Sequence, residues 1–216
     1  RSMYLGLSAF LDANTERREL LLGQRSPRFD SSFDEAIAQV GDDFERVVLK
    51  AQAARDYFLL VGPPGTGKTS RALRRMVEHF YATSSMQILL LAYTNRAVDE
   101  ICQSLSSITS GIDYIRVGSE LSCDVRFRGH LLENILAECN SRREVNTRMT
   151  DCRVYVGTVA SIAAKAELFK LKRFDVAIVD EATQILEPQL LGILCAKFAD
   201  ERNAVGKFIL IGDHKQ

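Results

Sequence analysis

The stretch "VGPPGTGKTS" occupies residues 61–70, directly after a short apolar run and directly before a segment of helical period. Its Gly62, Gly67, Lys68 and Thr69 fit the pattern G-x-x-x-x-G-K-[ST]. Glycines let such a loop turn its backbone N–H groups toward phosphate oxygens, and the N-terminus of the following helix adds partial positive charge there. A glycine-rich turn with an exposed lysine is the alternative, which the strand–loop–helix context disfavours. The stretch therefore predicts a nucleotide phosphate site formed by Gly62, Pro63, Pro64, Gly65, Thr66, Gly67, Lys68, Thr69 and Ser70.

The same pattern of strand followed by helix continues along the chain. Apolar residues recur at spacings of three and four between the apolar runs, as at Leu73, Met76, Val77 and Phe80, which is typical of helices. The runs themselves are mostly continuous and not alternating, which indicates strands covered on both faces. We therefore predict an α/β fold, a parallel sheet with helices on both faces. The six predicted strands are residues 57–62, 87–93, 113–118, 152–158, 174–180 and 207–213.

Two regions fit this alternation less well. Residues 1–45 contain a helical patch and then a Pro/Ser/Asp turn cluster, so we expect an N-terminal arm or the end of a preceding domain there. The α/β domain itself is expected over residues 46–216, and a polar, basic insertion that contains one helix is expected at 119–150. Within it, "RFRGH" (126–130) places an aromatic residue beside arginines that could stack on single-stranded bases, although such residues more often form a solvated face.

The composition sets limits on the class of protein. Lys+Arg and Asp+Glu are both 28 in 216 residues, which excludes a strongly basic nucleic-acid binder but allows a local basic groove. No apolar run approaches the roughly 20 residues of a membrane span, so we expect no membrane partner. The five cysteines have no metal-ligand spacing and are odd in number, which favours free thiols in a reducing, cytoplasmic compartment.

A second motif, "VAIVDEATQ" (176–184), supplies acids. Four apolar residues place Asp180 at the C-terminal end of a strand, where open α/β sheets bind ligands. Asp180 can hold Mg²⁺ and its water shell, and Glu181 can act as general base toward the attacking water. The alternative for an acidic pair after a strand is a helix cap. Beside a phosphate loop, the pair predicts nucleotide hydrolysis.

Five motifs together carry a resemblance. "GPPGTGKTS", "LAYTNRAVDEI", "VGTVASI", "VDEATQ" and "LIGDHKQ" occur in the order and rough spacing of the first RecA-like motor lobe of superfamily 1 helicases. They are most similar to the branch containing the nonsense-mediated-decay helicase and the replication helicase–nuclease. The resemblance covers about residues 57–216. It implies a P-loop NTPase that uses ATP and Mg²⁺ to move on single-stranded DNA or RNA, truncated before its second motor lobe.

The resemblance also implies residue roles. Lys68, Glu181 and Gln216 would be catalytic, with Gln216 sensing the γ-phosphate, and Thr69 and Asp180 would hold the metal. Thr94, Asn95 and Thr158 would contact the nucleic-acid backbone. For Asn95 the alternative is simple helix capping. The glutamine with which this family usually recognises adenine is not at its expected place, where Phe44 stands, flanked by Gln39 and Gln52.

Other nucleotide-binding classes remain as alternatives. An AAA-type ATPase that remodels protein would share the phosphate loop, but "TNRAVDE" and "GDHKQ" favour the helicase type. A transporter ATPase would need an LSGGQ-like signature and a GTPase an N-K-x-D motif, and the sequence has neither. A non-catalytic module that binds nucleotide without hydrolysis is disfavoured by Glu181.

Overall fold

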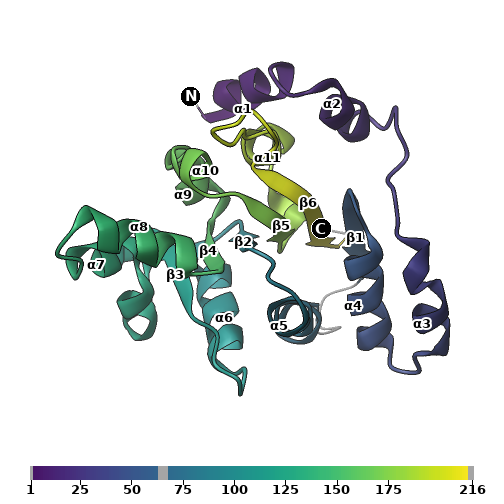
Figure 1. Cartoon of the computed structure of the whole chain (residues 1–216), viewed down its shortest axis with the longest axis horizontal. Helices are drawn as coiled ribbons and strands as arrows, with labels where there is room; N and C mark the ends of the chain where they lie inside the picture. The colour runs from purple at the N-terminus through teal and green to yellow at the C-terminus, as the bar shows by residue number, and fades with distance from the viewer. Residues whose placement is uncertain (1, 63–67, 214–216) are drawn as a thin grey trace.

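The computed structural model describes residues 2–62 and 68–213, apart from the side chains of Ser2 and residues 68–70. Its centre is a parallel six-stranded sheet in the order β1-β6-β5-β2-β4-β3 (Figure 1). All six predicted strands are confirmed, with shifts of one or two residues at their ends. Their bounds are β1 Tyr57–Val61, β2 Ile88–Ala92, β3 Tyr114–Val117, β4 Val154–Thr158, β5 Phe174–Val179 and β6 Val205–Gly212.

The register aligns the carboxyl ends of neighbouring strands along one edge of the sheet. Val61 of β1 pairs with Gly212 of β6, and Leu91 of β2 pairs with both Val179 of β5 and Gly157 of β4. Every residue of β2 is fully buried, which explains why that strand is a continuous apolar run. The residues that follow neighbouring strands therefore lie side by side, with about 5 Å between one strand and the next.

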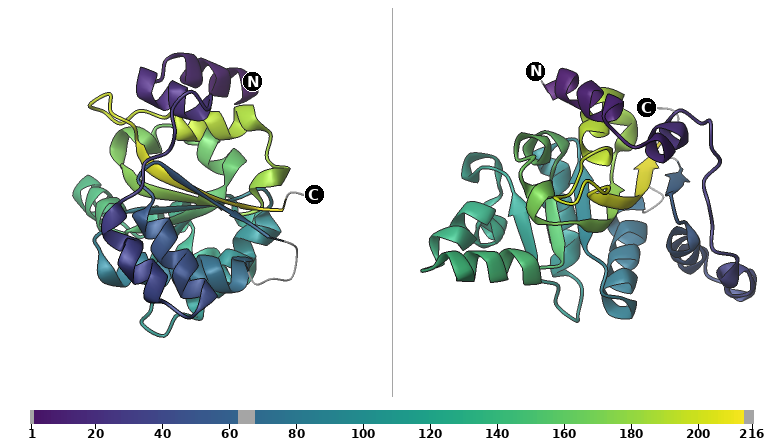
Figure 2. Two further views of the ribbon diagram at one scale, coloured as in Figure 1. Left: turned by 90° about the vertical axis from the view of Figure 1, so that its right-hand side faces the viewer. Right: turned by 45° about the horizontal axis from the view of Figure 1, so that its top comes forward.

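Helices cover both faces, as predicted (Figure 2, left). One face packs against α4 (Asp43–Ala53), α5 (Arg74–Thr83) and α6 (Asn95–Ser106), and a π-helical turn, Lys68–Leu73, leads into α5. The other face packs against α7 (Leu132–Ala137), α9 (Val159–Ala164), α10 (Leu168–Leu171) and α11 (Glu187–Leu194). Two apolar layers hold the sheet between them.

The N-terminal segment starts over α11 and runs past the edge strand β1 to its last helix, which lies beside α4 (Figure 1). It comprises α1 (Ser2–Leu11), α2 (Thr15–Leu21), a 3₁₀ turn at Ser31–Phe33 and α3 (Asp34–Gln39). α1 crosses α11 so closely that a Cβ on Gly6 would lie 1.7 Å from the carbonyl oxygen of Pro188. Buried Arg17 of α2 donates to the carbonyls of Val205 and Gly206. Because α4 begins at Asp43, the expected boundary at 45/46 falls inside a helix.

The insertion differs from the expectation in two ways. Residues 119–150 hold two α-helices, α7 and α8 (Arg142–Asp151), where one was predicted, and two 3₁₀ turns, η3 (Glu120–Ser122) and η4 (Val125–His130). Base stacking by the aromatic residue of "RFRGH", the less favoured possibility, is excluded, because Phe127 is 4% exposed and packs in the core. The flanking arginines pair with acids, Arg126 with Asp124 and Arg128 with Glu120.

The described part of the chain bears on two further expectations. All five cysteines are free thiols, four of them buried. Among the helices of residues 2–62 and 68–213, none is both long enough and apolar enough to cross a bilayer.

Candidate functional site

The phosphate loop begins where β1 ends. Gly62 donates its N–H to the carbonyl of Gly212 at 3.3 Å, which ties the start of the loop to the end of β6. Pro63, Pro64, Gly65, Thr66 and Gly67 lie outside the described residues, as does Gln216. For Lys68, Thr69 and Ser70 the structure gives the backbone, which is helical, as expected after a phosphate loop.

The predicted acids lie two strands away, at the end of β5. Asp180 is 4% exposed, and its N–H donates to the carbonyl of Leu91 at 2.8 Å. Glu181 has the left-handed backbone conformation φ 51°, ψ 38° and makes no side-chain capping bond to the turn Ala182–Gln184, so the helix-cap alternative is wrong for this residue. A left-handed non-glycine residue costs about 1–2 kcal/mol, and such strain gathers at functional sites.

The surroundings of Glu181 favour its protonated form. Partial burial raises the pKa of the Glu181 carboxyl, and the negative charges of Asp180 and then Glu100 raise that pKa further. A carboxylate with a raised pKa is a stronger base toward water than an ordinary glutamate. The position at a strand end, the strained backbone and the electrostatics of Glu181 all suit a general base.

A third acid of this edge, Asp213, was not among the predicted site residues. It is 3% exposed at the end of β6, the strand that lies between β1 and β5. The signal was available, since "FILIGD" ends in an acid as "VAIVD" does. Just before it, Gly212 lies against the turn after Glu181, because a Cβ there would meet the Cγ2 of Thr183 at 2.9 Å.

The acids of this edge suit a magnesium ion with few protein ligands. In the ranges that the structure describes, no group of three or more His, Cys, Asp or Glu side chains could hold a metal ion. Mg²⁺ usually takes one or two carboxylates and completes its shell with water and substrate phosphates. The buried Asp180 after β5 and the buried Asp213 after β6 fit that requirement.

The predicted nucleic-acid contacts follow the next two strands, β2 and β4. Thr94 caps α6, its hydroxyl accepting from the N–H of Ala97 at 3.1 Å, so the capping alternative for Asn95 is wrong: Asn95 is the first helical residue and is exposed. Thr158 caps α9 with a hydroxyl that accepts from the N–H of Ser161 and donates to its Oγ. Thr158 is 6% exposed, so the structure presents Thr94 and Asn95 to solvent but not the Thr158 hydroxyl.

The glutamines considered for adenine recognition are engaged elsewhere. Gln39 donates to Glu35 at 3.1 Å, and the Oε1 of Gln52 lies 2.5 Å from the ring of His79. Phe44 packs under the guanidinium of Arg71, 4.2 Å from the ring centre. Nothing in these contacts marks an adenine site.

Comparison with known proteins agrees with this fold. Residues 45–216 match a family model described as "AAA domain". The chain is 32% identical over 222 residues to the DNA replication ATP-dependent helicase/nuclease JHS1 of Arabidopsis thaliana, covering 97% of this chain and 15% of that protein. It is 30% identical over 220 residues to the helicase/nuclease DNA2 of Bos taurus, covering 94% of this chain and 19% of that protein. The chain thus spans less than a fifth of the length of these relatives.

Solved structures support the fold alone. The UvsW helicase of bacteriophage T4 superposes with a TM-score of 0.53 in one structure, covering 84% of this chain and 34% of that chain at 15% identity. A second UvsW structure gives a TM-score of 0.51 at the same identity, covering 84% of this chain and 59% of that chain. These likenesses confirm the RecA-like parallel sheet with helices on both faces.

Proposed function

The chain belongs to the AAA domain family, as a first RecA-like motor lobe of the superfamily 1 helicase type, and from this we propose that it hydrolyses ATP to drive movement on single-stranded nucleic acid. The observation that carries the proposal is the order of strand ends along one edge of the sheet. Gly62, Asp213 and the Asp180–Glu181 pair follow β1, β6 and β5, and Thr94 and Thr158 lie at the ends of β2 and β4. The ends of β1, β6 and β5, here called the nucleotide half, suit a nucleotide. The ends of β2 and β4, here called the track half, suit the nucleic acid along which the protein would move.

The nucleotide half divides the chemistry among its residues. Residues 62–70 would hold the phosphates, with Lys68 as a point charge and Thr69 and Asp180 as the protein ligands of Mg²⁺. Bound Mg²⁺ would neutralise charge on the phosphate oxygens. Glu181 would accept a proton from the attacking water, and its left-handed backbone sets the direction in which the carboxylate leaves the strand. Gln216 would sense the γ-phosphate, as the resemblance implies.

The track half offers backbone contacts and no sequence reading. Thr94 uses its oxygen to cap α6, which leaves its O–H proton for a phosphate oxygen, and Asn95 adds an exposed amide. The hydroxyl of Thr158 is buried and already bonded to Ser161 of α9, so Thr158 would shape the edge and not contact a phosphate directly. The family resemblance further implies a second motor lobe that closes the nucleotide site, and the free cysteines favour a reducing, cytoplasmic location.

A protein-remodelling ATPase is the alternative outcome, because the description "AAA domain" names an ATPase class and no track. The relatives named as helicase/nucleases favour nucleic acid. A module that binds nucleotide without hydrolysing it is the other alternative.

The test is the ATPase rate of the protein that contains this chain, with and without single-stranded DNA and RNA. We expect strong stimulation by at least one polymer and a loss of about 100-fold or more in Glu181→Gln. Glu187→Gln, which changes an exposed acid at the start of α11, is the matched control and should keep the wild-type rate. A rate indifferent to both polymers would refute the track, and a rate unaffected by Glu181→Gln would refute the assigned base.

A further inference from the structure

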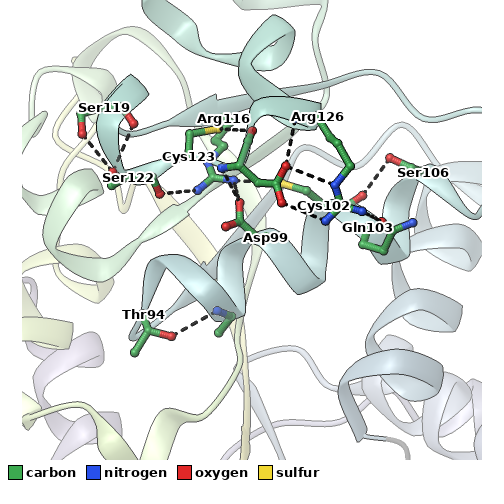
Figure 3. A network of polar contacts seen from close by, with 12 residues as sticks. Thr94, Asp99, Cys102, Gln103, Ser106, Arg116, Ser119, Ser122, Cys123 and Arg126 are labelled. Atoms are coloured by element: carbon green, nitrogen blue, oxygen red, sulfur yellow. Dashed lines mark hydrogen bonds and ion pairs between the residues drawn. The ribbon is translucent and has the colours of Figure 1, made fainter.

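Arg116 is a buried charge in the edge strand β3. It is 1% exposed, and Nη1 of its guanidinium donates to Oδ1 of Asp99 on α6 (Figure 3). Nη2 donates to the carbonyl of Ser122 at 3.3 Å, and the Sγ of Cys102 lies 4.0 Å from Nη1. A methionine or leucine would fill this place without the desolvation that a buried guanidinium suffers. Stability alone therefore does not account for an arginine here.

The pair joins α6 to the segment that follows β3. Oδ1 of Asp99 also accepts from the N–H of Asp124 at 3.4 Å. One turn along α6, the Oε1 of Gln103 accepts from Arg126 at 2.6 Å (Figure 3). Two successive turns of α6 are thus held to Asp124 and Arg126 by polar contacts with defined directions.

This attachment bears on the track half of the edge, because the proposed track contacts Thr94 and Asn95 stand at the start of α6. Asp99 lies about 7 Å along the helix from Thr94. The apolar face of α6, which includes Ile101 and Leu105, packs against the core through contacts that have no preferred direction. The guanidinium fork has a fixed geometry, so it can set the rotation of α6 about its axis.

We propose that Arg116 is a positioning residue for track binding, which through Asp99 holds α6 in the orientation that presents Thr94 and Asn95 to nucleic-acid phosphates. The inference rests on the proposed function and concerns the track half alone. Binding geometry of this kind must be kept within about 0.5 Å and 10–20°. The nucleotide half is built on β1, β6 and β5, none of which contains a partner of Arg116. Loss of the fork should therefore weaken the track and spare the nucleotide.

The chain offers a matched control in Arg153, which directly precedes β4 and so lies at the amino ends of the strands, away from the proposed site. This half-buried arginine donates to the carbonyls of Tyr81 and Ser84 at 2.9 Å and of Met86 at 3.4 Å. Arg153→Met removes a comparable set of hydrogen bonds without touching α6 or its attachment.

The experiment measures the affinity for fluorescein-labelled oligothymidylate and oligouridylate by anisotropy, together with basal ATPase, in the protein that contains this chain. For Arg116→Met we expect about tenfold weaker binding, with the basal kcat and the KM for ATP within about twofold of wild type. Arg116→Lys, which keeps the charge but not the fork, should recover part of the affinity. Arg153→Met should bind as wild type even where its Tm falls. Because Thr94 and Asn95 carry no charge, the slope of log Kobs against log salt should stay that of wild type.

Wild-type affinity in Arg116→Met would overturn the inference. So would equal losses of affinity, basal ATPase and Tm, since these would make Arg116 a structural residue. Where Arg116→Met does not fold, Asp99→Asn removes the charge at the other end and is expected to weaken binding in the same direction, and an unchanged affinity there refutes the proposal. Failure of the proposed function is distinct, because the wild type itself would then neither bind oligonucleotide nor respond to it.

Discussion

Lys207 of β6 offers a sharp test of what stabilises the junction between α4 and β1. Its side chain is 7% exposed, and Nζ donates to the carbonyls of Ala51 at 2.8 Å and of Gln52 and Ala54 at 2.9 Å. The C-terminal carbonyls of a helix have no partner within it, so one ammonium group satisfies the end of α4, the helix that leads into β1 and the phosphate loop. Burial lowers the pKa of Lys207 to about 8, so the amine keeps its charge and its three donors at pH 7.

The expected effect of Lys207→Met follows from these contacts. Methionine keeps much of the apolar stem but leaves three carbonyls without their donor, at about 1–3 kcal/mol for each one that water cannot reach. Relief from burying a charge offsets part of this loss. We expect the free energy of unfolding to fall by about 2–4 kcal/mol, which for a chain of this size lowers Tm by about 5–15 °C.

Two other lysines complete a graded series. Lys172, equally buried, donates to the carbonyls of Met149 at 3.2 Å and Thr150 at 3.0 Å, so Lys172→Met should lose about half as much. Lys197 forms an exposed pair with Glu201, and Lys197→Met should stay within about 0.5 kcal/mol of wild type.

The measurement is urea unfolding at pH 7, followed by far-UV circular dichroism and by tyrosine fluorescence, since the chain has no tryptophan. Coincident transitions would license two-state free energies. A Lys207→Met value no larger than that of Lys197→Met would refute the reasoning that carbonyl satisfaction stabilises this junction.

Three further outcomes are expected. Gly212→Ala would place a Cβ 2.9 Å from the Cγ2 of Thr183 and push the turn after the proposed base; we expect about tenfold slower ATP hydrolysis, partly restored by adding Thr183→Ala, and no restoration would refute the clash. Buried Asp56 pairs with Arg25 at 3.0 Å and with Arg28 at 2.8 Å in the N-terminal segment. Asp56→Asn should lower the free energy of unfolding by about 1–3 kcal/mol and speed limited proteolysis within residues 22–30. An unchanged cleavage rate would contradict this. Burial lowers the pKa of His79 from 6.5, so the unfolded chain takes up protons first and stability should fall as the pH drops below 6.5; urea midpoints from pH 7.5 to 5 should show this in wild type and less in His79→Gln.

The sequence was sufficient for the strands and the acidic pair, for a physical reason. A strand buried on both faces must be apolar throughout, so β2 and β5 read as uninterrupted runs, and the polar residues directly after them are placed by the end of the run. The same logic extends to Asp213, whose buried position follows from "FILIGD" once the run is recognised as a strand.

What depended on packing between distant segments could not be predicted. Phe127 and its arginines read as a basic aromatic patch, yet the ring packs in the core because the segment after β3 folds back onto α6. Arg116 lies within the predicted strand 113–118 and drew no interpretation from the sequence, because its partner Asp99 is 17 positions earlier and is brought against it only by the fold. The strand order was not predicted either. β6 is the last strand of the chain, yet it lies between β1 and β5 in the sheet.

The two halves of the edge meet at β5 and β2, and α6 provides a second connection between them. The hydrogen bond from the N–H of Asp180 to the carbonyl of Leu91 holds the ends of these two strands together. α6 starts at the track contacts, and the charge of its Glu100 acts on Glu181 of the nucleotide half. Among the three causes that raise the pKa of Glu181, the charge of the exposed Glu100 is the smallest, so a small rotation of α6 without nucleic acid should change the basal ATPase rate by no more than about twofold. In the proposed function, the coupling between track and hydrolysis belongs on this helix, whose orientation the Arg116–Asp99 pair fixes.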